Sequence, residues 1–265
     1  MLSVLCALLL GALEGITEWL PVSSTGHLIL LSDRLPLSMS EEFQELFDVV
    51  IQLGAILGVL FLYRQELFPL RERSVRLWGL ILLGVIPSAT AGFLLDEWIF
   101  SHFFNPQTIA SMLILWGILF LGLERTAQRK PPVFLSAEDL TPKRSLLIGL
   151  WQILALIPGT SRSGATVCGA RLLGCSQESA ARFSFFLAIP TMAGASLLKV
   201  ARYARNGFSP TKEELLWLGL GALTAFLVSL VTLRFLTDYV RRHGFFAFGI
   251  YRILLGCLVL LDYFL

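Results

Sequence analysis

The chain has 265 residues, of which 15% are charged and 55% are apolar, and its mean hydropathy is +0.74. A soluble domain carries about 25% charged residues. The composition therefore excludes a disordered chain, a nucleic-acid-binding protein and an ordinary cytosolic enzyme. A net charge of +2 is too small to indicate an acidic partner. We expect one membrane domain over residues 1–265, surrounded by membrane lipids, with no separate soluble domain.

The first apolar stretch, residues 4–32, is interrupted by the run PVSSTG at residues 21–26. Proline lacks a backbone donor and clashes with the preceding turn, so a helix ends before it. Each remaining half is too short to cross a bilayer, which needs about 20 residues. The stretch predicts a re-entrant pair of half-helices, which is stable at membrane depth only inside protein or beside a wet cavity. No Lys or Arg precedes Arg34, so we expect no cleaved signal peptide.

Two further kinds of apolar segment follow. A second interrupted stretch, residues 145–175, is broken by the run PGTSRSG at residues 158–164 and predicts a second re-entrant pair. Six uninterrupted stretches are long enough to span a bilayer; they are residues 46–64, 76–95, 107–123, 180–200, 214–235 and 244–264. The expected fold is an all-α polytopic membrane protein with six transmembrane helices plus two re-entrant helix pairs.

The two halves of the chain, residues 1–125 and 140–265, look like one repeat. At a nearly constant offset of 138 or 139, similar residues recur in both halves; examples are Gly11 and Gly149, Glu14 and Gln152, Ser23 and Ser161, Gly26 and Gly164, and Gly117 and Gly256. Each half has one re-entrant pair and three spans. Because three is odd, the second half is expected to be inverted relative to the first. Inverted repeats with broken helices place a site where the breaks meet near the midplane.

Basic residues in the loops predict the orientation. With this topology, 14 Lys and Arg residues lie on one side of the membrane and 5 on the other. The side with more Lys and Arg is normally cytoplasmic. Both termini are therefore expected outside the cytoplasm, although the basic loop 199–212 runs against the rule.

Glu14 and Glu18 precede the first break and are spaced to share one helical face. A carboxylate at membrane depth is costly and indicates function by default, unless the half-helix lies shallow enough for interfacial water. Two like charges one turn apart repel, so either one stays protonated or a cation lies between them. Oxygen ligands suit Mg²⁺ or Ca²⁺, and Mg²⁺ commonly also binds substrate phosphate.

The first break itself supplies hydroxyls and a histidine. Ser23, Ser24 and Thr25 can cap the following half-helix, whose N-terminal N–H groups favour an anion. Capping alone would explain one hydroxyl of the three. His27 lies one turn further on; a lone histidine is often structural, but this one follows two glutamates and a hydroxyl cluster, which favours a catalytic role.

The second break supplies an arginine among further hydroxyls, with Ser161, Arg162, Ser163 and Thr166 as candidates for substrate binding. A buried arginine needs an anionic partner, and its planar fork binds phosphate with two hydrogen bonds. The alternative is that Arg162 only pairs with Glu14 or Glu18 across the repeat interface. Together the two breaks offer the groups needed to hold and attack a phosphate ester or diphosphate.

The residues alone leave other functions open. A transporter for an anion, or a flippase for a lipid carrier, would also place an anion site on the symmetry axis. Paired glutamates beside a histidine favour catalysis, because a pure anion carrier gains nothing from two carboxylates next to its substrate. Gln52 interrupts a span, and we expect its side chain to form a hydrogen bond between helices. Arg252 is either a second anion contact or a snorkelling side chain.

The sequences EGITEWLPVSSTGH at residues 14–27 and PGTSRSGAT at residues 158–166 resemble the two signature motifs of the undecaprenyl-diphosphate phosphatases, the bacterial bacitracin-resistance membrane proteins. The resemblance covers the whole chain, including its two-half organisation, and neither motif departs from the family pattern. It implies a membrane enzyme that hydrolyses a polyprenyl diphosphate to the monophosphate and so recycles the cell-wall lipid carrier.

The resemblance also implies the inverted-repeat fold, location in the bacterial cell membrane, dependence on a divalent cation, and an active site open to the extracytoplasmic side. The functional positions it implies are Glu14, Glu18, Ser24, His27, Arg162 and Thr166. Whether Ser24 or His27 attacks the phosphorus stays open. The oligomeric state is also open, with a homodimer as one possible arrangement.

Overall fold

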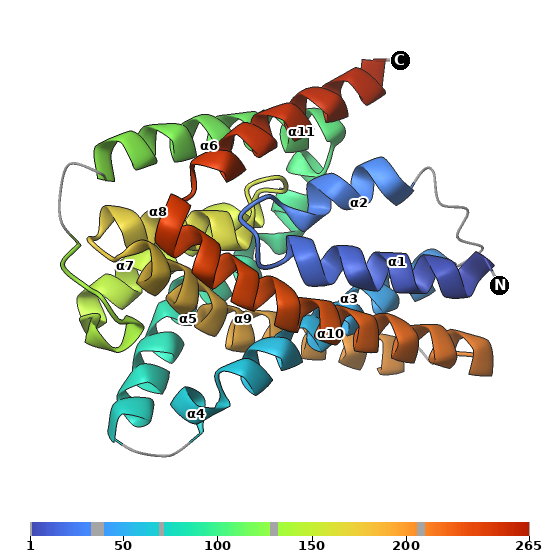
Figure 1. Ribbon diagram of the computed structural model, residues 1–265. Helices are drawn as coiled ribbons and strands as arrows, with labels where there is room; N and C mark the ends of the chain where they lie inside the picture. Colours follow the sequence, from blue (N-terminus) through green and yellow to red (C-terminus); the bar gives the residue numbers. More distant parts are fainter. Residues whose placement is uncertain (1, 33–39, 69–71, 128–131, 206–209, 265) are drawn as a thin grey trace.

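The computed structural model describes residues 2–32, 40–68, 72–127, 132–205 and 210–264. Over these residues it consists of helices, with one isolated pairing between Phe134 and Cys175 and no β-strand (Figure 1). The α-helices are α1 Leu2–Thr17, α2 Ser24–Ser32, α3 Glu41–Leu62, α4 Arg64–Leu67, α5 Glu72–Phe103, α6 Pro106–Ala127, α7 Pro142–Ile153, α8 Arg162–Leu172, α9 Gln177–Arg205, α10 Lys212–His243 and α11 Phe246–Phe264. Two short 3₁₀ helices are η1 Ala137–Asp139 and η2 Leu154–Leu156.

Six helices in the described part of the chain are long and apolar enough to cross a membrane, namely α3, α5, α6, α9, α10 and α11. They coincide with the six spans expected from the sequence, which confirms the all-α, polytopic part of the prediction. Apolar side chains also cover much of their outer surface; Phe93 of α5, for example, is 87% exposed. Such a surface is stable against lipid rather than against water.

The two interrupted stretches form helices that are broken where the prolines predict. Helix α1 ends at Thr17, four residues before Pro21, and α2 begins at Ser24. Helix α7 starts with Pro142 at its first turn and is followed by η2, and α8 begins at Arg162 after the second break. In Figure 1 the turn between α1 and α2 and the loop before α8 approach each other in the middle of the molecule.

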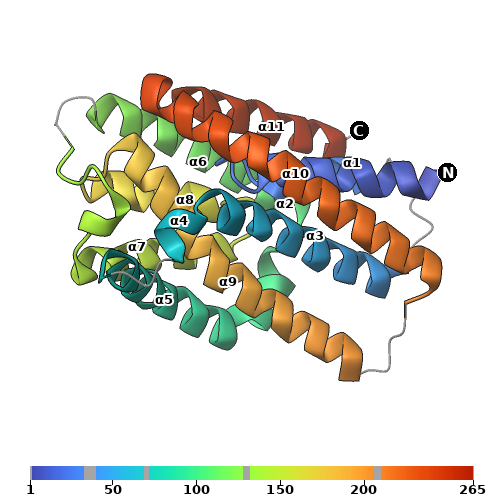
Figure 2. The same ribbon diagram turned by 60° about the horizontal axis from the view of Figure 1, so that its bottom comes forward.

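The helices of the two halves pack in matching pairs. Helix α1 crosses α10 where Gly11 and Gly221 meet, and α7 crosses α5 where Gly149 and Gly84 meet. A Cβ atom at Gly11 would lie against the Gly221 carbonyl oxygen, and one at Gly149 against the Gly84 carbonyl oxygen. These are the close backbone approaches that small residues allow between membrane helices. Figure 2 shows α10 running across α1 and α3, with α9 beside α3.

The contact between α6 and α11 contains two equivalent close approaches of a glycine to a backbone carbonyl. A Cβ at Gly117 would lie 2.7 Å from the carbonyl oxygen of Gly249, and a Cβ at Gly256 would lie 2.8 Å from that of Ala110. Shifting Gly117 and Ala110 by the sequence offset of 139 gives Gly256 and Gly249. The same contact therefore occurs twice, with the two helices exchanged.

We predict that Gly149→Ala lowers the thermal midpoint of unfolding, because the added Cβ forces α7 away from the α5 backbone at a cost of about 1–3 kcal/mol. Gly79→Ala in α5 is the matched control, since a Cβ there meets nothing within 4 Å and alanine is the better helix former. Thermal unfolding of both purified variants in the same detergent measures the difference. Equal midpoints would contradict the tight α5–α7 crossing.

Candidate active site

A cavity of about 190 Å³ lies where the two chain breaks meet. Its wall is formed by residues of both breaks together with side chains of α3 and α9; these residues are Thr17, Glu18, Ser23, Ser24, Gln52, Ala155, Ile157, Pro158, Gly159, Ser161, Arg162 and Met192. The polar groups come mainly from the two motifs. Ala155, Ile157 and Met192 form an apolar part of the wall, so the cavity can accept a ligand with one polar and one apolar end.

The first break places a carboxylate beside a hydroxyl. Glu18 lies in the turn just after α1, and its N–H still donates to the carbonyl of Glu14 at 3.0 Å, so the helical spacing expected for the two glutamates continues into the break. The Ser24 hydroxyl donates to Glu18 Oε2 at 3.4 Å. Ser24 is the first residue of α2, where backbone N–H groups without helical partners favour an anion.

The two breaks share an unusual backbone feature. Ser23 and Ser161 both have φ of +72°, and they are the only non-glycine residues with positive φ among the described residues. This conformation is uncommon for a residue with a side chain and persists only where its surroundings enforce it, often at functional sites. Both serines line the cavity, and each immediately precedes a candidate site residue, Ser24 or Arg162.

The second break is held against the first by its serines. The Ser161 hydroxyl accepts a hydrogen bond from the Gly164 N–H at 3.1 Å and so caps α8. The Ser163 hydroxyl lies 3.3 Å from the Glu18 carbonyl and 3.2 Å from the Leu20 carbonyl, to which it donates. Ser163 therefore contacts the first break directly, although it does not line the cavity.

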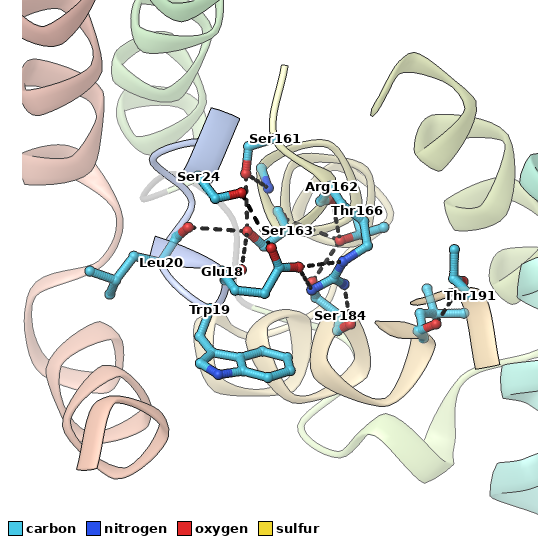
Figure 3. A network of polar contacts seen from close by, with 12 residues as sticks. Glu18, Trp19, Leu20, Ser24, Ser161, Arg162, Ser163, Thr166, Ser184 and Thr191 are labelled. Carbon is cyan, nitrogen blue, oxygen red and sulfur yellow. Dashed lines mark hydrogen bonds and ion pairs between the residues drawn. The ribbon is translucent and has the colours of Figure 1, made fainter. Parts of the chain in front are cut away.

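Arg162 and Glu18 form a buried ion pair across the two breaks (Figure 3). Arg162 donates to Glu18 Oε1 from Nε at 3.3 Å and from Nη2 at 3.2 Å, and Nη1 donates to the Ser184 carbonyl at 2.8 Å. The pairing foreseen as an alternative thus exists, with Glu18 as the partner. Because both side chains also line the cavity, the guanidinium can exchange its carboxylate partner for a ligand anion without leaving its place.

Glu14 lies one helical turn before Glu18 and does not line the cavity. Its side chain is only 1% exposed, and Oε1 has no hydrogen-bond partner among the described residues. A buried oxygen without a partner needs an explanation, such as a proton or a cation that completes it. The hard oxygen donors of Glu14 and Glu18 suit Mg²⁺ or Ca²⁺, although the described residues contain no cluster of three acidic, histidine or cysteine side chains.

His27 is not among the residues that line the cavity. Its Nδ1 lies 2.7 Å from the Ser23 carbonyl oxygen, which can only accept, so Nδ1 carries the proton of the neutral ring. Nε2 then accepts from the Tyr251 hydroxyl at 2.6 Å, and the two rings stack at 5.6 Å. The structure therefore places His27 against the backbone of the first break and α11, rather than against Ser24.

Of the remaining residues singled out from the sequence, some line the cavity and others connect the helices around it. Thr166 is fully buried and bonds the Ser184 hydroxyl at 2.6 Å, so it fixes α8 to α9. The side chain of Thr25 lies outside the described residues. Gln52 lines the cavity, a position that the expected interhelical hydrogen bond did not indicate. Met192, Tyr251 and Ser184 had no sequence signal, because apolar and small hydroxyl residues are common in any membrane helix.

Comparison with known proteins identifies the family. Residues 7–258 match the family model described as bacitracin resistance protein BacA. The chain is 48% identical over its whole length to a protein named undecaprenyl-diphosphatase from Acetivibrio thermocellus, covering 99% of that protein. It is 47% identical to undecaprenyl-diphosphatase 1 of Clostridioides difficile, and the match covers 100% of this chain and 98% of that protein. It is 45% identical to an undecaprenyl-diphosphatase of Enterococcus faecalis, and that match covers 98% of this chain and 97% of the relative. The chain therefore belongs to the bacitracin resistance protein BacA family.

Proposed function

We propose that the protein hydrolyses undecaprenyl diphosphate to the monophosphate and inorganic phosphate in the bacterial membrane. The observation that carries the proposal is the cavity in which Ser24, Glu18 and Arg162 from the two breaks face one space. Near-full-length similarity to proteins named undecaprenyl-diphosphatase supports the same substrate. The activity would return the cell-wall lipid carrier to use and would make bacitracin resistance a consequence of its abundance.

Ser24 is the better placed nucleophile. Its hydroxyl lines the cavity and donates to Glu18 Oε2, which can accept its proton. Ser24 Oγ would bond to the terminal phosphorus, the bond from that phosphorus to the bridging oxygen would break, and the lipid monophosphate would leave. Water would then hydrolyse the phosphoserine, releasing phosphate and restoring the hydroxyl. Arg162 and the α8 N-terminus would stabilise the charge on the phosphoryl oxygens.

A divalent cation fits the acidic side of the site. Glu14 offers a buried oxygen without a partner, and Glu18 offers a carboxylate at the cavity wall, so these two residues would hold Mg²⁺ or Ca²⁺. When bound, the cation would neutralise negative charge on the diphosphate. Ser24 and Arg162 keep the roles given above in its presence.

An anion transporter or a lipid flippase remains the second candidate, because a central phosphate site on an inverted repeat suits it as well. Release of inorganic phosphate from a purified polyprenyl diphosphate separates the two. Purified protein that binds the diphosphate but releases no phosphate, with or without added Mg²⁺, would overturn the phosphatase function.

We also infer an inverted repeat of two re-entrant pairs, with halves at residues 1–125 and 140–265. Support comes from the matched crossings of α1 with α10 and α7 with α5, and from the paired glycine contacts of α6 with α11. The excess of basic residues on one side supports placing both termini outside the cytoplasm, and the family resemblance implies that the site opens to the same side.

The orientation predicts a labelling pattern in a cysteine-free background. Ser40→Cys and Tyr263→Cys should react with an impermeant thiol reagent added outside intact cells, whereas Leu135→Cys should react only after permeabilisation. All three positions are exposed in the structure. Labelling of position 135 from outside, with protection of 40 and 263, would invert the topology.

The cation site predicts that chelation abolishes phosphate release and that Mg²⁺ or Ca²⁺ restores it. Glu14→Gln keeps the size of the side chain but removes its charge, so it should raise the cation concentration needed for half-maximal activity as well as lower turnover. Metal titration of wild type and variant measures both. Full activity in excess chelator would rule out the site.

Arg162→Lys should reduce turnover by about 10²–10³-fold, the typical loss when one charge-stabilising donor is removed. Lysine keeps the charge but cannot make the two parallel bonds of the guanidinium. Steady-state kinetics on the purified variant test this. Near-wild-type turnover would mean that Arg162 supplies only a positive potential.

Ser24→Ala tests whether Ser24 attacks the phosphorus. With a serine nucleophile, Ser24→Ala should lose essentially all turnover. A variant that stays within about tenfold of wild type, the scale of one hydrogen bond, would make Ser24 a positioning group and leave His27 or water as the attacker. Tyr251→Phe is the companion variant, because it removes the hydroxyl that hydrogen-bonds His27 Nε2 and leaves Ser24 unchanged.

A further inference from the structure

Arg252 is a buried charged residue that neither motif contains. Its side chain in α11 is fully buried, at 0% exposure. No carboxylate oxygen of the described residues lies within 4.0 Å of it, since the ion pairs there involve other arginines. A buried charge without a counter-ion is strongly destabilising unless other groups replace its hydration. The replacement partners therefore indicate what the residue does.

Those partners are backbone carbonyls of both chain breaks. Arg252 Nη1 donates to the Pro21 carbonyl at 3.0 Å. Nη2 donates to the Gly159 carbonyl at 2.8 Å and to the Thr160 carbonyl at 2.9 Å. Carbonyls in a broken helix at membrane depth need donors from the protein itself. One guanidinium supplies them to the two breaks at once, because its fork points in two directions.

The arrangement follows the repeat. Pro21 and Gly159 are separated by the offset of 138 that relates the two halves, so the two Nη atoms reach equivalent carbonyls. The residue equivalent to Arg252 in α6, at the offset of 139, is Leu113. A Cβ at Gly26 would lie 2.9 Å from Leu113 Cδ1, and a Cβ at the equivalent Gly164 would lie 3.4 Å from Arg252 Nη1. One half thus contributes an arginine where the other contributes a leucine.

Two residues beyond Pro21 and Gly159 are the serines with positive φ, Ser23 and Ser161, and after them come Ser24 and Arg162. Fixing the two carbonyls therefore fixes the backbone from which both reacting groups project. Arg252 itself does not line the cavity, and its complete burial excludes snorkelling.

We propose that Arg252 is a positioning residue that holds the two chain breaks at the separation at which Ser24 and Arg162 engage one phosphate group. This inference rests on the proposed phosphatase function. Its effect should appear in kcat more than in KM, since misplacement of reacting groups by about 1 Å can cost about 10²-fold in rate.

The test compares Arg252→Lys and Arg252→Met with Arg171→Met. Arg171 of α8 is a matched control, because it is half-buried, lies outside the cavity and also donates to a backbone carbonyl, that of Cys175 at 2.7 Å. For each purified variant, the thermal midpoint and the kcat and KM for phosphate release from a polyprenyl diphosphate are measured well below the midpoint.

We expect both Arg252 variants to lose about 10²-fold in kcat with little change in KM, while Arg171→Met loses thermal stability but keeps the wild-type kcat. If Arg252→Met does not fold, Arg252→Lys decides, since it keeps the charge and loses only the fork. Wild-type kcat in Arg252→Lys, or a raised KM with unchanged kcat, would overturn the positioning role. Wild-type protein without phosphate release would instead overturn the proposed function.

Discussion

The structure depends on the need to satisfy the backbone of two chain breaks that lie inside a membrane protein. The helices stop before Pro21 and Pro158, and the backbone polar groups freed there need partners from the protein. For the first break, donors come from the opposite half of the chain: Ser163 bonds the carbonyls of Glu18 and Leu20. The halves are therefore held together at the point where their helices fail, and that is where the cavity forms.

The ion pair between the two breaks explains how the site holds two charged side chains inside the protein. Arg162 and Glu18 neutralise each other, so neither is an isolated buried ion. A phosphate that enters the cavity meets a guanidinium already oriented by the Ser184 carbonyl. Binding then exchanges one anion for another rather than ordering a mobile side chain, which lowers the entropic cost of association.

Much of the fold follows from local sequence, but the contacts of the site do not. Hydropathy gives the six spans, and the prolines give the breaks at 21–26 and 158–164. The motif residues Glu18, Ser24 and Arg162 do meet in one cavity. The orientation of His27 depends instead on Tyr251, a residue 224 positions away whose role no local pattern reveals. The positive φ of Ser23 and Ser161 is likewise imposed by tertiary contacts, since serine has no intrinsic preference for it.

The position of Arg252 in α11 has a consequence for biosynthesis. A membrane protein is made from its N-terminus, and α11 follows both chain breaks in the sequence. Until that helix inserts, the carbonyls of Pro21, Gly159 and Thr160 lack the donor that joins them. The first break is thus translated some 230 residues before its partner, and the contact that joins the two breaks forms only after α11 has been made.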